Sequence, residues 1–119
     1  MILGFIGVGK ITSSVVNGIF NSSIKFKKII LSPRNKKISK NLKKKFKKID
    51  IAKNNQDLID KSNWVFLAIT PDVGNKIIKD LKFKPSQTIV SFISTIALSE
   101  LRKAVKVKAK IVRAIPLPP

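Results

Sequence analysis

The feature that most constrains the fold is the alternation of short apolar runs with amphipathic stretches along the whole sequence. Residues 64–69 form a continuous apolar run, which is typical of a central strand buried on both faces of a parallel sheet. In residues 10–20, by contrast, Ile11, Val15 and Ile19 recur at every fourth position and predict one apolar face of a helix. Strands that alternate with helices are joined by right-handed crossovers, so the pattern predicts a mostly parallel sheet.

The pattern predicts six strands and five helices. The strands are expected at residues 2–6, 28–31, 49–52, 64–69, 88–93 and 110–115. The helices are expected at residues 10–20, 35–48, 55–61, 72–81 and 98–105, and Asn55 is the expected N-cap of the third. Because no linker or internal repeat interrupts this order, we expect one α/β domain over residues 1–119.

The charge balance is strongly basic, with 25 lysines and arginines, 6 aspartates and glutamates and a formal net charge of +19. Such a charge is usual in nucleic-acid-binding proteins, and charge alone supports that alternative. However, 22 of the basic residues are lysines, whereas specific recognition of phosphates and bases favours the planar fork of arginine. We therefore interpret most of the lysines as a solvated surface and expect no nucleic-acid partner.

The sequence contains no cysteine and no histidine, which excludes several classes of site. Disulfides and thiolate chemistry are excluded, and so is serine–histidine hydrolysis by this chain alone. The commonest zinc ligand is missing, so we expect no metal site. The six acids do not form a facing pair on the expected elements, and we name no catalytic residue. No apolar run is long enough to cross a bilayer, so we expect a cytoplasmic protein with no membrane partner.

Gly7 and Gly9 lie directly between the first expected strand and the first expected helix. In such a Gly-x-Gly loop, the first glycine allows a tight turn and the second lets the backbone approach a pyrophosphate. The amino terminus of the helix then offers free N–H groups to the phosphates. Thr12 stands where this fingerprint has its third glycine, which predicts a slightly wider gap between helix and strand. In this context the loop predicts a dinucleotide-binding site.

The end of the second expected strand distinguishes between the two nicotinamide cofactors. Proteins that bind NAD place an acid there to contact the ribose 2′-hydroxyl. This chain has Ser32, Pro33, Arg34 and Asn35 instead, with no acid nearby. Arg34 can form a charge-assisted hydrogen bond with a 2′-phosphate, and Ser32 and Asn35 can donate further hydrogen bonds. The sequence therefore predicts NADP (NADPH) as the cofactor.

Five motifs together resemble pyrroline-5-carboxylate reductase, over residues 1–119 and the amino-terminal half of such an enzyme. They are Gly4-Phe-Ile-Gly7-x-Gly9, Ser32 with Arg34, Asn54-Asn55-Gln56, Val65-Phe-Leu-Ala68-Ile-x-Pro71 and Val112-Arg-Ala-Ile-Pro116. The resemblance implies a three-layer Rossmann fold with strand order 3-2-1-4-5-6, followed in the family by a helical dimerisation and substrate domain that this chain does not contain. It also implies NAD(P)H-dependent reduction of a cyclic imine, a small-molecule substrate, to proline in proline biosynthesis.

The resemblance further implies which residues contact the cofactor. The phosphates are expected at Gly7, Gly9, Lys10 and Ile11, the adenosine end at Ser32 and Arg34, the adenine ribose near Asn55, and the nicotinamide ribose beside Ala68, Ile69, Thr70 and Pro71. Ile6, Asn35 and Ser94 complete the expected cofactor site. Homo-oligomerisation is expected only if a dimerisation domain follows downstream.

Three departures from the family lie at the expected carboxyl ends of strands, where ligands bind in open α/β sheets. Thr70 replaces the family's usual lysine, Ile93-Ser94-Thr95 replaces Ala-Ala-Gly, and Leu117 replaces a polar asparagine. Two alternatives therefore stay open beside the reductase. One is a dinucleotide-binding module without catalysis, and the other is a related reductase acting on another imine or a β-hydroxyacid.

Overall fold

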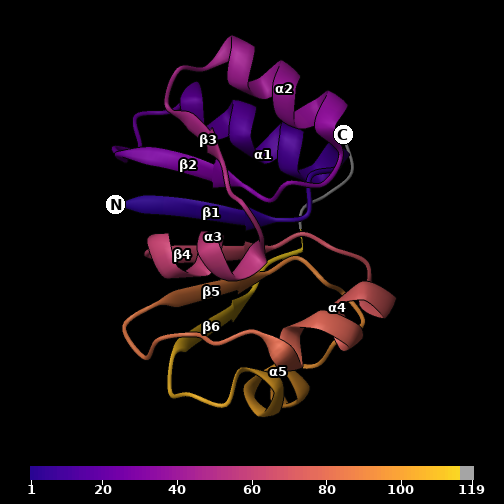
Figure 1. Cartoon of the computed structure of the whole chain (residues 1–119). Coiled ribbons are helices and arrows are strands. Elements are labelled where there is room, and N and C mark those ends of the chain that lie inside the picture. Colours follow the sequence, from indigo (N-terminus) through magenta and orange to yellow (C-terminus); the bar gives the residue numbers. More distant parts are fainter. Residues whose placement is uncertain (116–119) are drawn as a thin grey trace.

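The computed structural model describes residues 1–115 and contains one parallel sheet of six strands, in the order β3-β2-β1-β4-β5-β6 (Figure 1). The strands are β1 (Ile2–Ile6), β2 (Lys28–Leu31), β3 (Ile49–Ile51), β4 (Trp64–Leu67), β5 (Thr88–Ser91) and β6 (Lys110–Arg113). The predicted α/β fold, its strand order and its parallel connections are confirmed. The expectation on Leu117 lies outside the described residues.

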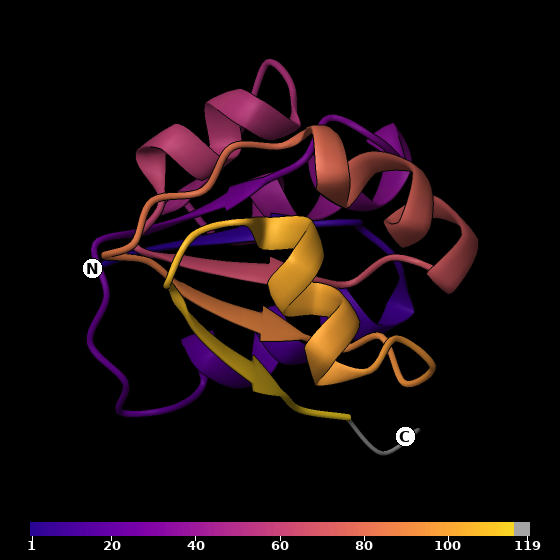
Figure 2. The same cartoon turned by 90° about the horizontal axis from the view of Figure 1, so that it is seen from below.

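The helices divide between the two faces of the sheet (Figure 2). They are α1 (Lys10–Phe20), α2 (Lys36–Lys45), α3 (Asn55–Lys61), α4 (Pro71–Ile77) with a 3₁₀ turn η1 (Ile78–Asp80), and α5 (Leu98–Val105). Val16 of α1 and Leu42 of α2 pack against one face, and Leu58, Ile78 and Leu101 pack against the other. Each face thus has its own apolar core. Within residues 1–115, no helix has the length and apolarity that a membrane crossing requires.

Three strands end two residues earlier than the sequence predicts, at Leu67, Ser91 and Arg113. The next N–H group still bonds the neighbouring strand in each case: Ala68 N donates to Ile6 O at 2.8 Å and Phe92 N donates to Leu67 O at 2.9 Å. Beyond these bonds the chain leaves the ladder and forms loops at the carboxyl edge of the sheet, where all the strand arrows point (Figure 2). Apolar residues after β4 and β5 therefore belong to loops, although their composition resembles that of a strand.

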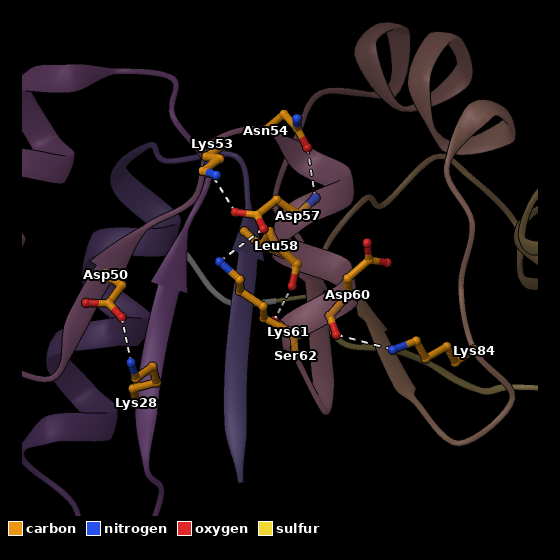
Figure 3. Close-up of polar contacts among 10 residues, drawn as sticks. All are labelled: Lys28, Asp50, Lys53, Asn54, Asp57, Leu58, Asp60, Lys61, Ser62 and Lys84. Carbon is orange, nitrogen blue, oxygen red and sulfur yellow. Dashed lines mark hydrogen bonds and ion pairs between the residues drawn. The ribbon is translucent and has the colours of Figure 1, made fainter.

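The predicted N-cap of α3 is wrong by one residue, because Asn54 and not Asn55 caps the helix. The side chain of Asn54 accepts from Asp57 N at 2.8 Å (Figure 3). Asp57 in turn accepts from Lys53 N at 3.1 Å and pairs with the Lys61 ammonium at 3.1 Å. The Lys53 N–H and then Lys61 keep the pKa of the Asp57 carboxyl below its ordinary value, so this first turn carries a negative charge at neutral pH. Asn55 is left without a capping role.

The predicted second helix is also too long, because α2 ends at Lys45 and the next residue, Phe46, is extended. Phe46 stacks on Phe20 of α1 with ring centroids 4.0 Å apart. This contact requires the chain to leave the helix before residue 48. At the edge of the sheet, the Lys28 ammonium bonds Asp50 at 2.7 Å and keeps the pKa of that carboxyl below its ordinary value (Figure 3).

Gly4 allows α3 to pack directly on β1. A Cβ atom at Gly4 would overlap Ser62 Oγ and Leu58 Cδ2, both of which are buried. Gly18, by contrast, is exposed on α1 and has open space where a Cβ would stand. The two glycines therefore differ in what an added methyl group would meet.

We expect Gly4→Ala to lower the free energy of unfolding by about 1–3 kcal/mol, because it overpacks the α3–β1 contact. The matched substitution Gly18→Ala should raise it by about 0.5–1 kcal/mol, because alanine favours the helix without meeting any neighbour. Urea unfolding followed by the fluorescence of Trp64 measures both. Changes of the same sign in the two variants would contradict this account of Gly4.

Candidate functional site

Gly7 is the residue at which the chain turns out of β1. Its φ of +97° lies in the left-handed region, which glycine adopts without strain. A Cβ at this position would overlap the carbonyl group of Ala68, the residue that follows β4. The tight turn predicted from the glycine loop is therefore present, and the proximity of β4 requires glycine there.

Gly9 is the N-cap of α1 and has no side chain with which to bond the first turn of the helix. An α-helix leaves its first N–H groups without intrahelical partners, so those of α1 are free to bind an anion. No heavy atom lies within 4 Å of the position that a Cβ of Gly9 would occupy, and the first turn contains no acid. A pyrophosphate can therefore approach this backbone closely, and the residues present fit a dinucleotide.

Two buried hydroxyl groups form hydrogen bonds with the main-chain N–H and C=O groups of Gly7. Ser32, directly after β2, accepts a hydrogen bond from Gly7 N at 3.0 Å, and Thr12 of α1 donates one to Gly7 O at 2.7 Å. The exposed fractions of Ser32 and Thr12 are 1% and 0%. We expected Ser32 to contact adenosine and Thr12 to widen a gap. In the structure both residues also contact the glycine loop through Gly7. No local sequence pattern reveals these contacts.

Two clefts lie on either side of the glycine loop. The larger has a cavity volume of about 320 Å³ and is lined by Gly9, Lys10, Ile11, Thr12, Ala68, Ile69, Thr70 and Phe92. The smaller, of about 20 Å³, is lined by Ile6, Gly7, Ser32, Arg34, Asn55, Ile69, Val73 and Ile77. Ile69 lines both, so the two clefts are neighbours, and we refer to them together as the path along the carboxyl edge of the sheet. This path has the order expected of a dinucleotide, with the phosphate loop between its two ends.

Most of the predicted cofactor residues line these clefts, and three do not. Asn35 has a left-handed backbone, φ +52°, and its side chain caps α2 by accepting from Ile38 N at 3.5 Å. Pro71 is the first residue of α4. Ser94 lies exposed in the turn after β5, and its carbonyl accepts from the Arg113 guanidinium. The three residues remain predictions as cofactor contacts.

Thr70 caps α4, which gives a structural reason for this residue where the resembled family usually has lysine. Its Oγ1 accepts from Val73 N at 3.4 Å. Threonine is a favoured N-cap, and lysine is not. From the sequence, Thr70 was expected beside the nicotinamide ribose and was noted as a departure from the family, and its role as an N-cap was not predicted because the helix was expected to begin at residue 72.

Arg34 lies exposed at the mouth of the smaller cleft. Within residues 1–115 its guanidinium forms no ion pair. Its backbone is fixed, because Arg34 O accepts from the buried Ser39 Oγ at 3.1 Å. An unpaired guanidinium on a fixed backbone is available to a phosphate group.

Three apolar residues that line the clefts were not predicted from the sequence. Phe92 follows β5, and Val73 and Ile77 belong to α4. Ile11 is 45% exposed although apolar, which is consistent with a surface that contacts a ligand. Only the strand endings could have revealed Phe92, because a residue just beyond a parallel strand lies at the ligand-binding edge.

Comparisons with known proteins agree with this geometry. Residues 2–98 match the family model of NADP oxidoreductases, coenzyme F420-dependent. No curated protein sequence matches the chain at a significant level.

Among solved structures, the chain is similar to 1-pyrroline-5-carboxylate reductase from Streptococcus pyogenes, with 31% identity and a TM-score of 0.80. The alignment covers 98% of this chain and 42% of that one. The reductase from Coxiella burnetii, at 21% identity and a TM-score of 0.85, covers 98% and 44%. The Plasmodium falciparum enzyme, whose structure contains NADP, has 23% identity and a TM-score of 0.79 and covers 96% and 41%. The latter two show the shared fold.

The chain thus spans about two fifths of the length of these solved reductases. The resemblance to pyrroline-5-carboxylate reductase that the sequence motifs indicate is confirmed, and so is the predicted cofactor, NADP(H). From the match over residues 2–98, the chain belongs to the family of NADP oxidoreductases, coenzyme F420-dependent.

Proposed function

We propose that this chain is the NADPH-binding part of a reductase that transfers a hydride to the imine carbon of pyrroline-5-carboxylate. The observation that carries the proposal is the path along the carboxyl edge of the sheet, with the open backbone of Gly9 beside the free amino terminus of α1. The 31% identity with the Streptococcus pyogenes reductase supports this substrate class.

The residues of the chain bind and orient the cofactor. The first turn of α1 binds the pyrophosphate, and Gly9 leaves room for it. Ala68, Ile69 and Phe92 form an apolar wall in the larger cleft, against which the reacting ring of the cofactor would pack. When bound, NADPH supplies the hydride, and the protein supplies orientation. No side chain of the described residues is assigned a proton-transfer role.

The preference for NADPH over NADH is proposed to depend on Arg34. We expect the unmodified chain to bind NADPH about tenfold more tightly, because one charge-assisted bond to the 2′-phosphate contributes about 1.5–3 kcal/mol. Arg34→Ala should remove most of this preference and leave the affinity for NADH nearly unchanged. Calorimetric titration with each cofactor measures both dissociation constants.

Lys44→Ala is the matched control for this experiment, because Lys44 is exposed near the far end of α2 and its loss removes the same charge. It should leave the ratio of the two affinities intact. Equal affinities for NADPH and NADH in the unmodified chain would show that Arg34 does not contact the 2′-phosphate.

Gly9→Val tests the phosphate site itself. The side chain would occupy the open space that the pyrophosphate needs, so we expect binding of both cofactors to be lost. The domain should remain folded, because Gly9 has an extended backbone, φ −116°, and no neighbour within 4 Å of a Cβ. Titration with NADPH and the circular dichroism melting curve measure the two effects. Gly18→Val, at the other open glycine of α1, should leave binding unchanged, and normal binding by Gly9→Val would refute the site.

Activity is tested by the oxidation of NADPH at 340 nm with pyrroline-5-carboxylate, using residues 1–119 and any longer product of the same gene. We expect residues 1–119 to bind NADPH without turnover, because the two clefts are taken up by the cofactor and their lining contains no group assigned to the substrate carboxylate. Turnover by residues 1–119 at about 1 s⁻¹, which is an ordinary rate for an enzyme, would show a complete active site in this chain. Binding without turnover in a longer product would favour the dinucleotide-binding module.

A further inference from the structure

The main-chain N–H and C=O groups of Gly7, which belong to successive peptide units, are each bonded by a side chain from a different element. Ser32 Oγ, at the end of β2, accepts from the N–H group at 3.0 Å, and Thr12 Oγ1, in the first turn of α1, donates to the carbonyl group at 2.7 Å. We call this arrangement of Gly7, Thr12 and Ser32 the Gly7 clamp. Both hydroxyl groups are buried, so water does not compete for either bond.

The bond from Thr12 is unusual for a helical threonine. Threonine within a helix normally bonds a carbonyl three or four residues earlier in the same helix. Thr12 instead bonds the carbonyl five residues earlier, which belongs to the loop and not to α1. The hydroxyl group therefore links the helix to the glycine loop, at the position where the dinucleotide fingerprint has a glycine.

Gly7, the residue that the clamp holds, is the one of the three with the greatest backbone freedom. Glycine samples both signs of φ when nothing restrains it, and Gly7 requires φ +97°. Gly7 lines the smaller cleft, while Gly9, two residues later, lines the larger. The main-chain conformation at Gly7 thus determines how the chain passes from one cleft to the other and where the first turn of α1 points.

We propose that Thr12 and Ser32 are positioning residues, which preorganise the glycine loop for the phosphates of the dinucleotide. This inference rests on the proposed cofactor site. Preorganisation raises affinity because less conformational freedom is lost on binding. Thr12 acts on the part of the cofactor that NADPH and NADH share, and Arg34 acts on the part that distinguishes them.

The test compares Thr12→Val, which removes the hydroxyl group at nearly constant volume, with Thr12→Ser, which keeps it. We expect Thr12→Val to weaken the binding of NADPH and NADH by the same factor, about tenfold, so that their ratio is unchanged. Thr12→Ser should restore most of the affinity. Ser32→Ala removes the other half of the clamp and should weaken NADH binding to a similar extent.

Ser62→Ala is the matched structural control. Ser62 is buried, and its Oγ donates to Leu58 O at 2.7 Å on α3, without contact with the glycine loop. Its substitution should lower the melting temperature and leave cofactor affinity unchanged. If Thr12→Val binds both cofactors as tightly as the unmodified chain does, or if Thr12→Ser binds as weakly as Thr12→Val, the proposal is overturned.

A second measurement does not depend on the cofactor. Hydrogen exchange at the Gly7 amide, followed by NMR without ligand, should be faster in Thr12→Val and Ser32→Ala than in Ser62→Ala. If the unmodified chain binds neither NADPH nor NADH, the proposed function fails, and this exchange rate alone decides the clamp. Unchanged exchange at Gly7 in both variants would overturn it. Should Thr12→Val not fold, Ser32→Ala decides both measurements.

Discussion

The close approach of β1 and β4 at their carboxyl ends is the constraint on which the site depends. The two strands remain hydrogen-bonded as far as Ala68 N and Ile6 O, and a Cβ on Gly7, the residue that follows β1, would overlap the Ala68 carbonyl. The chain can leave β1 only through a turn that glycine tolerates. The clefts open on the two sides of this turn, so a packing contact in the middle of the sheet determines where the clefts lie.

The sequence predicted the fold well because its signals are local and repeated. Six apolar runs, all but the last followed by a helical period, determine the element order, and the continuous run at residues 64–69 was expected at the centre of the sheet, where β4 lies beside β1. The predicted ends of the strands were less accurate where the apolar composition continues beyond the last residue of the strand. Residues 68 and 69 continue the apolar run of β4 but lie in a loop, because hydrogen bonding and not hydropathy ends a parallel strand.

The site was predictable only where a residue's role follows from its own chemistry. The turn at Gly7 and the open space at Gly9 were predictable because positive φ and close approach belong to glycine, and Arg34 was proposed as a phosphate contact from its charge. The choice between Asn54 and Asn55 was not predictable, since two adjacent asparagines are equally good caps until the position of the Asp57 N–H group is known. The links of Thr12 and Ser32 to Gly7 require the three-dimensional fold, because Ser32 lies 25 residues away in sequence.

The two clefts take their walls from different parts of the chain. Ser32 and Arg34 follow β2 at one end, whereas Ala68 and Thr70 follow β4 at the other. Under the proposed binding mode, the residues after β2 set the preferred coenzyme, and they can change without altering the wall that Ala68 and Thr70 form. Among the residues that line the clefts, Ile69 is common to both. Under the proposed binding mode, a substitution at Ile69 is therefore expected to act at both ends of the coenzyme at once.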